Sequence, residues 1–389
     1  MILFVAPYSP PTAGGSGHLG ATRKIEVIAS VLAHLDNEIL LVNSAHCSER
    51  PSPLSIRKIT IGGVDVTEIT PATSSNRAWG KLRNILFVKG IVRTIGDLGP
   101  PKFVWFYNGY AFEMQLCLLL ERTFRVPMIM EFEDWHFSRR RGLNPKPLID
   151  YCYWRLAAPR LSGVFVANSH LGTKMARFTN RVELLPGVVP QTLAKIAIQR
   201  PPFAVSRGPV RIGFFGGLSV EKGADLVLEL ANTLPEGFIL HVTGTGPLAA
   251  DFYARAKVAP RSLQYHGHVN DARLYELIAE CDVILNPHSS IREMNDGVFP
   301  FKLIEAVASA RLAISTQVPM LQLHDVLAGV QFVEHSSQAF HSAVLASREF
   351  HFAHADVIAR SAALANQRFG EESLLASIRS MVGPTGLDT

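Results

Sequence analysis

Two glycine-rich turns could hold a phosphate group, because each follows a short apolar run and precedes a predicted helix. The first is GGSGHLG at residues 14–20. The second is GFFGGLSVEKG at residues 213–223, where Gly216 and Gly217 precede Lys222. Glycine lets the backbone approach a phosphate closely, and a helix start offers free N–H groups. A cation such as Lys222 is unfavourable at a helix start unless an anion lies nearby, which favours a ligand phosphate. The alternatives are a flexible loop and a solvated surface lysine.

Two further segments carry groups that suit a nucleotide. VTGTGP at residues 242–247 places Gly244 in another strand-to-helix turn, either lining the same cleft or serving as a structural turn. In GVFPFKLIEA at residues 297–306, Glu305 lies within an apolar helix, where an unpaired carboxylate would be costly. Hydrogen bonds to a ribose diol would satisfy it. Lys302 lies three residues earlier on the same helical face and could reach a diphosphate, or it could pair with Glu305.

The elements that must position these groups are short apolar strands alternating with helices, which indicates an α/β fold with parallel sheets. The 389 residues favour two domains, and the proline-rich segment 186–209 is interpreted as their connection. We expect two doubly wound halves that face each other across a cleft, with ligands at the carboxyl ends of the strands. The predicted strands are residues 2–6, 38–43, 103–106, 128–132 and 163–167, then 210–215, 238–243, 263–266, 283–286 and 312–316. The predicted helices include 21–35, 224–234 and 303–310, and residues 339–381 are predicted to be largely helical.

The order of these motifs resembles family 4 of the retaining glycosyltransferases, which have the GT-B fold. The resemblance spans most of the chain and is strongest in its C-terminal half. It rests on the first glycine-rich loop, Gly216 with Lys222-Gly223, Gly244-x-Gly246, His266-Gly267-His268-Val269, Cys281-Asp282-Val283 and Pro300-x-Lys302-x-x-Glu305-Ala306. It implies an N-terminal Rossmann-like acceptor domain at 1–190 and a C-terminal donor domain at 191–365. A final helical segment at 366–389 is expected to pack back on the first domain.

The resemblance also implies roles for single residues. Lys222 would contact the donor diphosphate, and Glu305 would hold the ribose hydroxyls. The backbone near His268 and Val269 would recognise the base. The loop at Gly14 and Gly15 would close over the phosphates from the other domain.

The chain departs from the family pattern at two positions. Gly217 stands where an arginine is usual, and Gly297 stands where a glutamate is usual. We expect Arg292 or Lys302 to replace the missing positive charge. Asp296, beside Gly297, could take the place of the glutamate near the sugar.

Acidic residues gather after the strand near residue 130, in the sequence EFEDWH at 131–136. Carboxylates at the end of a buried strand are costly unless they serve a ligand or an ion pair. The resembled family has acceptor-side polar groups in this region, so we expect Glu133 or Asp134 to orient the acceptor hydroxyl. The alternative is an ion pair with the arginines at 139–141.

Charge is uneven along the chain. Residues 1–190 hold 22 Lys and Arg against 14 Asp and Glu, whereas the remainder is slightly acidic. A basic half suggests an anionic partner, such as a phospholipid surface or a phosphate-linked acceptor. The basic amphipathic segments 79–93 and 147–160 could lie on a membrane, or their aromatic residues could belong to the core. No nucleic-acid-reading motif, membrane-spanning run or metal site is predicted, and no cofactor is expected.

These observations predict a cytoplasmic hexosyltransferase, peripheral on the inner membrane face where its acceptor is lipid-linked. It would move a sugar from a UDP- or GDP-sugar to a saccharide or lipid-linked saccharide. A role in cell-surface polysaccharide or lipopolysaccharide synthesis follows from the resemblance alone. The alternatives are a non-catalytic scaffold or partner subunit of the same fold, another GT-B enzyme such as a sugar-nucleotide epimerase or an inverting transferase, and a dinucleotide oxidoreductase.

Overall fold

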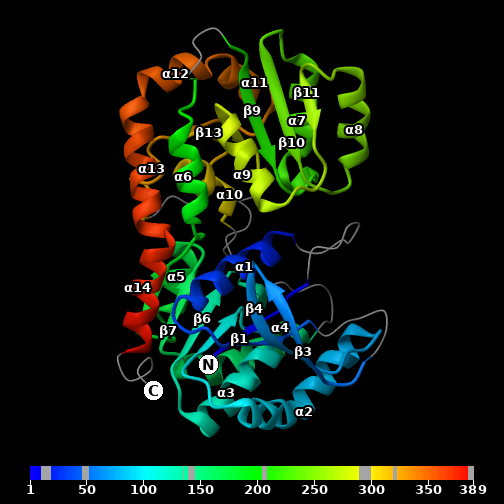
Figure 1. Ribbon diagram of the computed structural model, residues 1–389, viewed down its shortest axis with the longest axis vertical. Helices are drawn as coiled ribbons and strands as arrows, with labels where there is room; N and C mark the ends of the chain where they lie inside the picture. The colour runs from blue at the N-terminus through cyan, green and yellow to red at the C-terminus, as the bar shows by residue number, and fades with distance from the viewer. Residues whose placement is uncertain are drawn as a thin grey trace. The chain divides into compact units, whose positions relative to one another are not determined.

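The computed structural model describes residues 1–9, 19–45, 52–133, 135–138, 145–203, 208–288, 299–318 and 322–383. The chain divides into two compact units, shown with their element labels in Figure 1. The first consists of Met1–Val188 together with Glu372–Thr389, and the second is Val189–Glu371. The sequence analysis placed the first boundary at 190/191 and the start of the final segment at residue 366.

The first unit contains an eight-stranded sheet with the order β3-β4-β2-β1-β5-β6-β7-β8. All neighbouring strands are parallel except β3 and β4, which form an antiparallel hairpin. Gly62 and Gly63 make its turn, with φ values of 56° and 83° that glycine adopts readily. The strands are β1 (Ile2–Ala6), β2 (Ile39–Asn43), β3 (Ser55–Ile61), β4 (Val64–Thr70), β5 (Val104–Tyr107), β6 (Met128–Phe132), β7 (Gly163–Val166) and β8 (Val182–Leu184).

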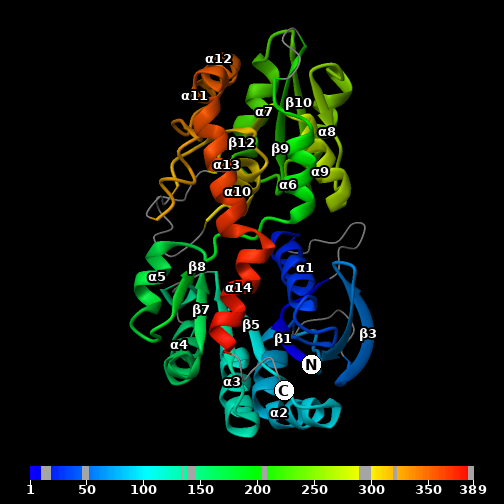
Figure 2. The same cartoon turned by 60° about the vertical axis from the view of Figure 1, so that its left-hand side comes forward.

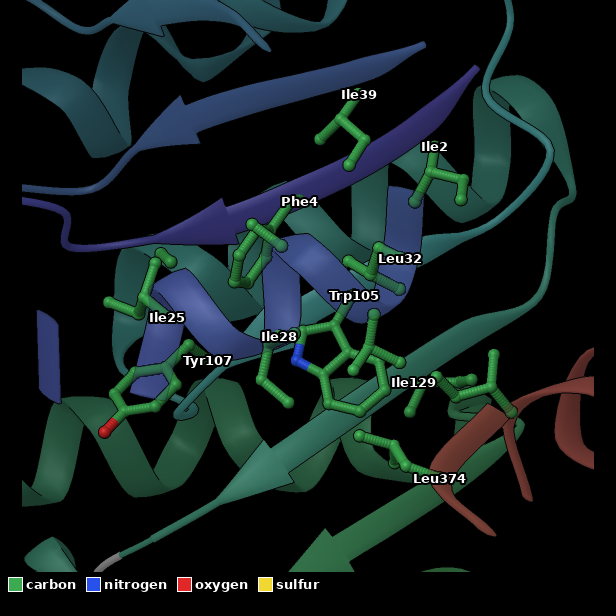
Figure 3. Packing of buried hydrophobic residues seen from close by; sticks show 14 of the residues in the cluster. Ile2, Phe4, Ile25, Ile28, Leu32, Ile39, Trp105, Tyr107, Ile129 and Leu374 are labelled. Atoms are coloured by element: carbon green, nitrogen blue, oxygen red, sulfur yellow. The ribbon is translucent and has the colours of Figure 1, made fainter. Parts of the chain in front are cut away.

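Helices cover both faces of this sheet. They are α1 (Leu19–Ala33), α2 (Arg77–Leu98), α3 (Ala111–Phe124), α4 (Lys146–Ala157), α5 (Ser169–Met175) and α14 (Glu371–Val382), with short 3-10 turns at η1 (His136–Ser138) and η2 (Ala158–Arg160). On one face, α1 and α14 pack against Trp105 of β5 and Ile129 of β6. Figure 3 shows these two residues together with Leu374 of α14. On the opposite face, Cys117 of α3 contacts Met128 of β6.

The last helix therefore returns to the first unit. Leu374, Ile378 and Met381 of α14 are almost fully buried in the core that contains β1 and β5. A side chain at Gly163 of β7 would collide with the Met381 sulfur, at 2.4 Å from an added Cβ. Arg181, before β8, donates a hydrogen bond to the backbone carbonyl of Ser380. Residues more than 180 positions apart in the sequence thus share one core (Figure 2).

The second unit contains a six-stranded parallel sheet with the order β11-β10-β9-β12-β13-β14. Its strands are β9 (Val210–Phe215), β10 (Phe238–Thr243), β11 (Leu263–Tyr265), β12 (Val283–Asn286), β13 (Leu312–Ser315) and β14 (Gln331–Phe332). Its helices are α6 (Gln191–Gln199), α7 (Ala224–Thr233), α8 (Ala249–Val258), α9 (Asp271–Glu280), α10 (Phe301–Ala308), α11 (Ser337–Leu345), α12 (Ser347–Ala353) and α13 (Ala355–Phe369), with a 3-10 turn at η3 (Val220–Lys222). Figures 1 and 2 show these helices on both sides of the sheet.

Every predicted strand is present, and the two doubly wound α/β sheets confirm the predicted fold class. Three details differ from the prediction. The hairpin β3–β4 was not predicted, because the mostly exposed β3 and the partly buried β4 lack the continuous apolar run of the buried parallel strands. The segment 186–209 contains the first boundary between the units, as predicted, but it also holds the helix α6 at Gln191–Gln199, which lies within the second unit. The helix predicted at 303–310 begins earlier, at Phe301, and ends at Ala308.

Candidate functional site

The carboxyl end of the second sheet offers a binding position at a topological switch point. Strand β9 lies between β10 on one side and β12 on the other, so the chain leaves β9 in one direction and later returns on its opposite side. The loops after these strands diverge, which leaves a crevice at the carboxyl ends where ligands of open α/β sheets usually bind. The predicted donor residues Gly216, Gly217, Lys222 and Gly244 all lie in the loops after β9 and β10.

Backbone hydrogen bonds hold these loops to one another. The Gly216 N–H donates to the Thr243 carbonyl at 3.0 Å, and the Leu218 N–H donates to the Thr245 carbonyl at 2.9 Å. The Gly244 N–H donates to the Gly267 carbonyl at 2.7 Å. The turns after β9, β10 and β11 therefore form one connected layer of backbone.

This layer requires glycine at two of its positions. Gly244 has a φ of 125°, and an added Cβ would lie 1.8 Å from the carbonyl oxygen of Gly216. Gly216 has a φ of 131°, and its Cβ would lie 2.3 Å from the ammonium nitrogen of Lys302. Gly217 differs, because its nearest contact from an added Cβ is the Lys222 Cγ at 3.8 Å, an ordinary distance. The backbone of Gly216 and Gly217 thus lies close to the side chains of Lys302 and Lys222, respectively.

Lys222 ends the 3-10 turn η3, one residue before Gly223, the N-cap of α7. Gly223 has a left-handed conformation and lies very close to the loop that follows β12. A Cβ added at Gly223 would lie 2.0 Å from the Pro287 carbonyl oxygen. This close approach places the Lys222 ammonium 2.8 Å from Nε2 of His288 and 3.3 Å from a carboxylate oxygen of Glu221. Lys222 is about one-third exposed, so its charge remains accessible from solvent.

His288 is buried directly after β12 and is uncharged at neutral pH. Its pKa is lowered to about 4, mainly by burial and also by the nearby positive charges of Lys222 and Lys302, against an opposite effect of Glu221. Because an ammonium group can only donate, Nε2 of the neutral ring accepts the hydrogen bond and Nδ1 carries the proton. Thr316 donates from its hydroxyl to the His288 carbonyl at 2.8 Å, which fixes the backbone at this position.

The predicted ribose-binding residue, Glu305, is 3 % exposed and lies in the middle turn of α10. Lys302 lies one turn earlier on the same helix, as predicted, and its ammonium group lies 5.3 Å from the ring centroid of Phe214 at the end of β9. The predicted base-recognition residues follow β11, the strand that pairs with β10 on the side away from β9. His268 is exposed and Val269 is half-buried there, beside the Gly267 carbonyl that binds the Gly244 N–H.

Five of the predicted site residues lie outside the described residues: Gly14, Gly15, Asp134, Arg292 and Asp296. The described loops therefore bring together Gly216, Gly217, Lys222, Gly244 and Lys302. This arrangement brings two lysine side chains to the same glycine turn, which suits an anionic ligand.

The predicted acceptor-side residue Glu133 belongs to a buried charged cluster in the first unit. Lys24 of α1 forms ion pairs with both Glu133 and Glu131, the second at 2.7 Å. Lys24 and Glu131 are nearly inaccessible, whereas the Glu133 side chain is 24 % exposed. The Glu133 N–H donates to the side-chain oxygen of Asn108, which follows β5. Glu133 thus forms an ion pair, but with Lys24. The arginines at 139–141, which the sequence offered as its partners, lie outside the described residues.

Glu133 is poised to change its charge near neutral pH. Its pKa is raised to about 7, mainly by burial and also by the negative charge of Glu131, while the ammonium of Lys24 opposes both effects. The same two carboxylates raise the pKa of Lys24 above its usual value, although its burial alone would lower it. The first unit therefore holds a partly exposed carboxyl group at the carboxyl end of its sheet.

Sequence reasoning missed His288 and Lys24. The position of His288, directly after the apolar strand β12 and Pro287, is a signal that could have identified it, because strand ends of a parallel sheet converge at the binding edge. Lys24 shares one helix face with Ile28 and Val31, which are both buried, so it also had a detectable signal. Within the described residues, no group of three or more His, Cys, Asp or Glu side chains could hold a metal ion.

Residues 209–347 match the family described as "Glycosyl transferases group 1". The match coincides with the sheet of the second unit and its described loops, including Lys222, His288 and Glu305. The second unit therefore contains a group 1 glycosyltransferase domain. No curated protein matches the chain.

Several solved structures are similar along almost the whole chain. Anabaena HepE in complex with UDP is 14 % identical, with a TM-score of 0.65 over 97 % of this chain and 98 % of that one. The catalytic domain of starch synthase IV from Arabidopsis thaliana, bound to ADP and acarbose, is 12 % identical, with a TM-score of 0.61 over 99 % of both chains. Sucrose-phosphate synthase from Thermosynechococcus elongatus is 12 % identical, with a TM-score of 0.59 over 98 % of both. At these identities the likeness shows the fold, which is GT-B.

Proposed function

We propose that this glycosyltransferase moves a hexose, with retention of configuration, from a UDP- or GDP-sugar to a saccharide or lipid-linked saccharide. The observation that carries the proposal is the convergence of Lys222 and Lys302 on the bare Gly216–Gly217 backbone. Cleavage of the bond between the sugar and the diphosphate leaves negative charge on the leaving phosphate. Two preorganised ammonium groups would stabilise that charge most when it is greatest, which lowers the barrier.

The other donor groups follow from the same geometry. Glu305 would accept hydrogen bonds from the ribose hydroxyls, and the backbone at Gly267 to Val269 would contact the base. We propose uracil as the first choice of base, supported by the HepE structures in complex with UDP and with UDP-glucose. Arg292 and Asp296 remain proposed donor contacts, and Gly14 and Gly15 remain the proposed phosphate loop.

On the acceptor side we propose Glu133, with Asp134 beside it, as the carboxylate that orients the attacking hydroxyl. Glu133 is the partly exposed member of its cluster, so it can accept a hydrogen bond from a ligand while Lys24 holds its other side. We place the protein in the cytoplasm, at the inner membrane face for a lipid-linked acceptor. The pathway would be the synthesis of a cell-surface polysaccharide or lipopolysaccharide.

Calorimetry of the purified protein against UDP, GDP, ADP, CMP and NAD tests the donor. We expect UDP or GDP to bind without added metal, and Glu305→Ala to weaken that binding. The anomeric configuration of the product, determined by NMR, tests retention against inversion. Nucleotide binding without turnover on any acceptor would instead support the scaffold alternative, which the absence of a cationic side chain at Gly217 favours. Binding of NAD alone would overturn the proposal.

A further inference from the structure

Helix α2 presents large apolar side chains to solvent. Trp79 is 59 % exposed, Leu82 48 %, Leu86 67 % and Phe87 66 %. They lie within three turns of the same helix, whose opposite side buries Val88, Ile91 and Ile95. An apolar core on one side of a helix accounts for one apolar stripe, and these four residues form a second one with no core to fill.

Basic side chains are interleaved with this second stripe. Arg83, Lys89 and Arg93 are all exposed, and at 100° per residue they fall on the same half of the helix as Trp79 and Leu86. The one acidic residue of α2 is Asp97, which lies in the last turn beyond the apolar residues. The exposed half of the first four turns therefore combines apolar and positively charged groups.

The neighbouring helices extend the same character. In the first unit α2 packs against α3, and α3 packs against α4, so the three lie in sequence over one face of the sheet. Exposed apolar residues recur on α4 at Leu148, Ile149 and Leu156. The exposed basic residues nearby are Arg122 and Arg125 at the end of α3 and Arg155 and Arg160 on and after α4. The acidic residues of α3 and α4 are less accessible: Glu113 and Asp150 are buried, and Glu121 is half-buried beside Arg160.

We propose that the exposed face of α2, with α4 as an additional contact, docks on an anionic phospholipid bilayer. Trp79, Leu86 and Phe87 would enter the boundary between headgroups and acyl chains. Arg83, Lys89 and Arg93 would contact lipid phosphates. Tryptophan is favoured at this boundary because its ring is apolar and its N–H is polar. The combination of exposed apolar groups and cations matches a charged bilayer better than a neutral one, because each component supplies part of the binding free energy.

The contact would be peripheral. Within the described part of the chain, no helix is both long and apolar enough to cross a bilayer. The surface belongs to the first unit alone and shares no residue with the proposed donor site, so it does not depend on the proposed sugar transfer.

The test is sedimentation with vesicles of phosphatidylcholine alone and of phosphatidylcholine mixed with phosphatidylglycerol. We expect the full chain to sediment with the anionic vesicles at low salt and to be released by high salt. The double variant Leu86→Ser/Phe87→Ser should lose most of this binding. Each substitution of Arg83, Lys89 or Arg93 by Gln should lower the partition coefficient about fivefold, the equivalent of about 1 kcal/mol.

Helix α8 of the second unit provides a matched control. It carries exposed Tyr253 and Val258 beside Arg255 and Lys257, so it resembles α2 in composition but has a shorter apolar face. Tyr253→Ser/Val258→Ser should leave vesicle binding unchanged. All variants change exposed residues, and unchanged thermal unfolding together with an unchanged UDP-induced shift would show that they fold normally.

Fluorescence gives a second readout at a single residue. Trp105 and Trp154 are fully buried and Trp135 is half-buried, whereas Trp79 is exposed. A blue shift of emission on adding anionic vesicles that is seen in the wild type and lost in Trp79→Phe would therefore come from Trp79. Failure of the wild-type chain to sediment with anionic vesicles at low salt would overturn the proposal. Equal loss of binding in the α8 variant would also overturn it, since the contact would not then be specific to α2. A chain that docks but binds no nucleotide would leave the docking surface intact and count only against the proposed function.

Discussion

The ammonium nitrogen of Lys222 lies 2.8 Å from Nε2 of His288, a residue 66 positions later in the chain. The buried imidazole is neutral, so it orients the ammonium without cancelling its charge. The ammonium is therefore held beside His288 while its charge remains available to an anion.

Replacing Lys222 by Met should weaken UDP binding about 10- to 100-fold, the range expected for loss of a hydrogen bond to a charged group. Uridine lacks the diphosphate, so its affinity should not change. Titration calorimetry with the two ligands measures the difference. Lys257→Met, on α8 where the ammonium lies over Tyr253, is the matched control. Equal weakening of both ligands would mean that Lys222 does not act on the phosphates.

Replacing His288 by Leu should reduce UDP affinity less, by about fivefold, because the ammonium remains but is no longer oriented. His288→Gln should recover part of the loss, since the amide oxygen can accept the hydrogen bond. The loss should disappear in a Lys222→Met background, because His288 acts through Lys222. Additive losses in the double variant would show that His288 contributes independently of this pair.

The protein should become less stable as the pH falls from about 6.5 to about 4. The pKa values of His288 and His241 are lowered to about 4 by burial, so both stay neutral in the native state while the unfolded chain takes up protons. Each histidine would then decrease the free energy of unfolding by about 1.4 kcal/mol per pH unit within this interval, and its contribution is fully present above it. Urea denaturation at several pH values measures the slope.

The matched variant for this dependence is His288→Gln, which does not titrate. Its stability curve should be flatter than that of the wild type between pH 6.5 and 4, and parallel to it above pH 7. An unchanged slope would show that His288 is protonated in the native state as readily as in the unfolded one.

Gly244→Ala should disrupt the loop layer of the second unit. The new Cβ would lie 1.8 Å from the Gly216 carbonyl oxygen at a φ that alanine rarely adopts, so the backbone must move. We expect a loss of about 1–3 kcal/mol in stability together with loss of UDP binding. Gly217→Ala is the control, since its Cβ would have only an ordinary contact at 3.8 Å, and it should fold normally. Equal stability of the two variants would contradict the described geometry.

Lys24→Met should destabilise the first unit by about 3–5 kcal/mol, because it leaves Glu131 and Glu133 facing each other without their shared cation. Chemical denaturation measures this loss. Glu133→Gln should cost much less, since the buried pair of Lys24 and Glu131 survives. A milder effect of Lys24→Met than of Glu133→Gln would mean that Lys24 is not the centre of the cluster.

Local patterns in the sequence were sufficient for the fold class and for much of the second unit. The apolar runs at β9, β10 and β12 predict buried parallel strands because both faces of such a strand are covered. The glycines at 216 and 244 predict turns because few other residues adopt their conformations. The predicted site residues followed from these turns, since a loop after a parallel strand lies at the binding edge.

Only the tertiary structure placed residues that are distant in the sequence beside one another. His288 meets Lys222 because β12 pairs directly with β9, and Lys24 meets Glu131 because α1 packs over the end of β6. The return of α14 to the first unit depends on the shape of the core around Trp105 and Ile129. Strand order and core shape are set by packing summed over the whole chain, whereas strands and turns are set by residues within a few positions of each other. The sequence by itself therefore determined the elements and the loops that carry the chemistry, and the packing of those elements decided which side chains act together.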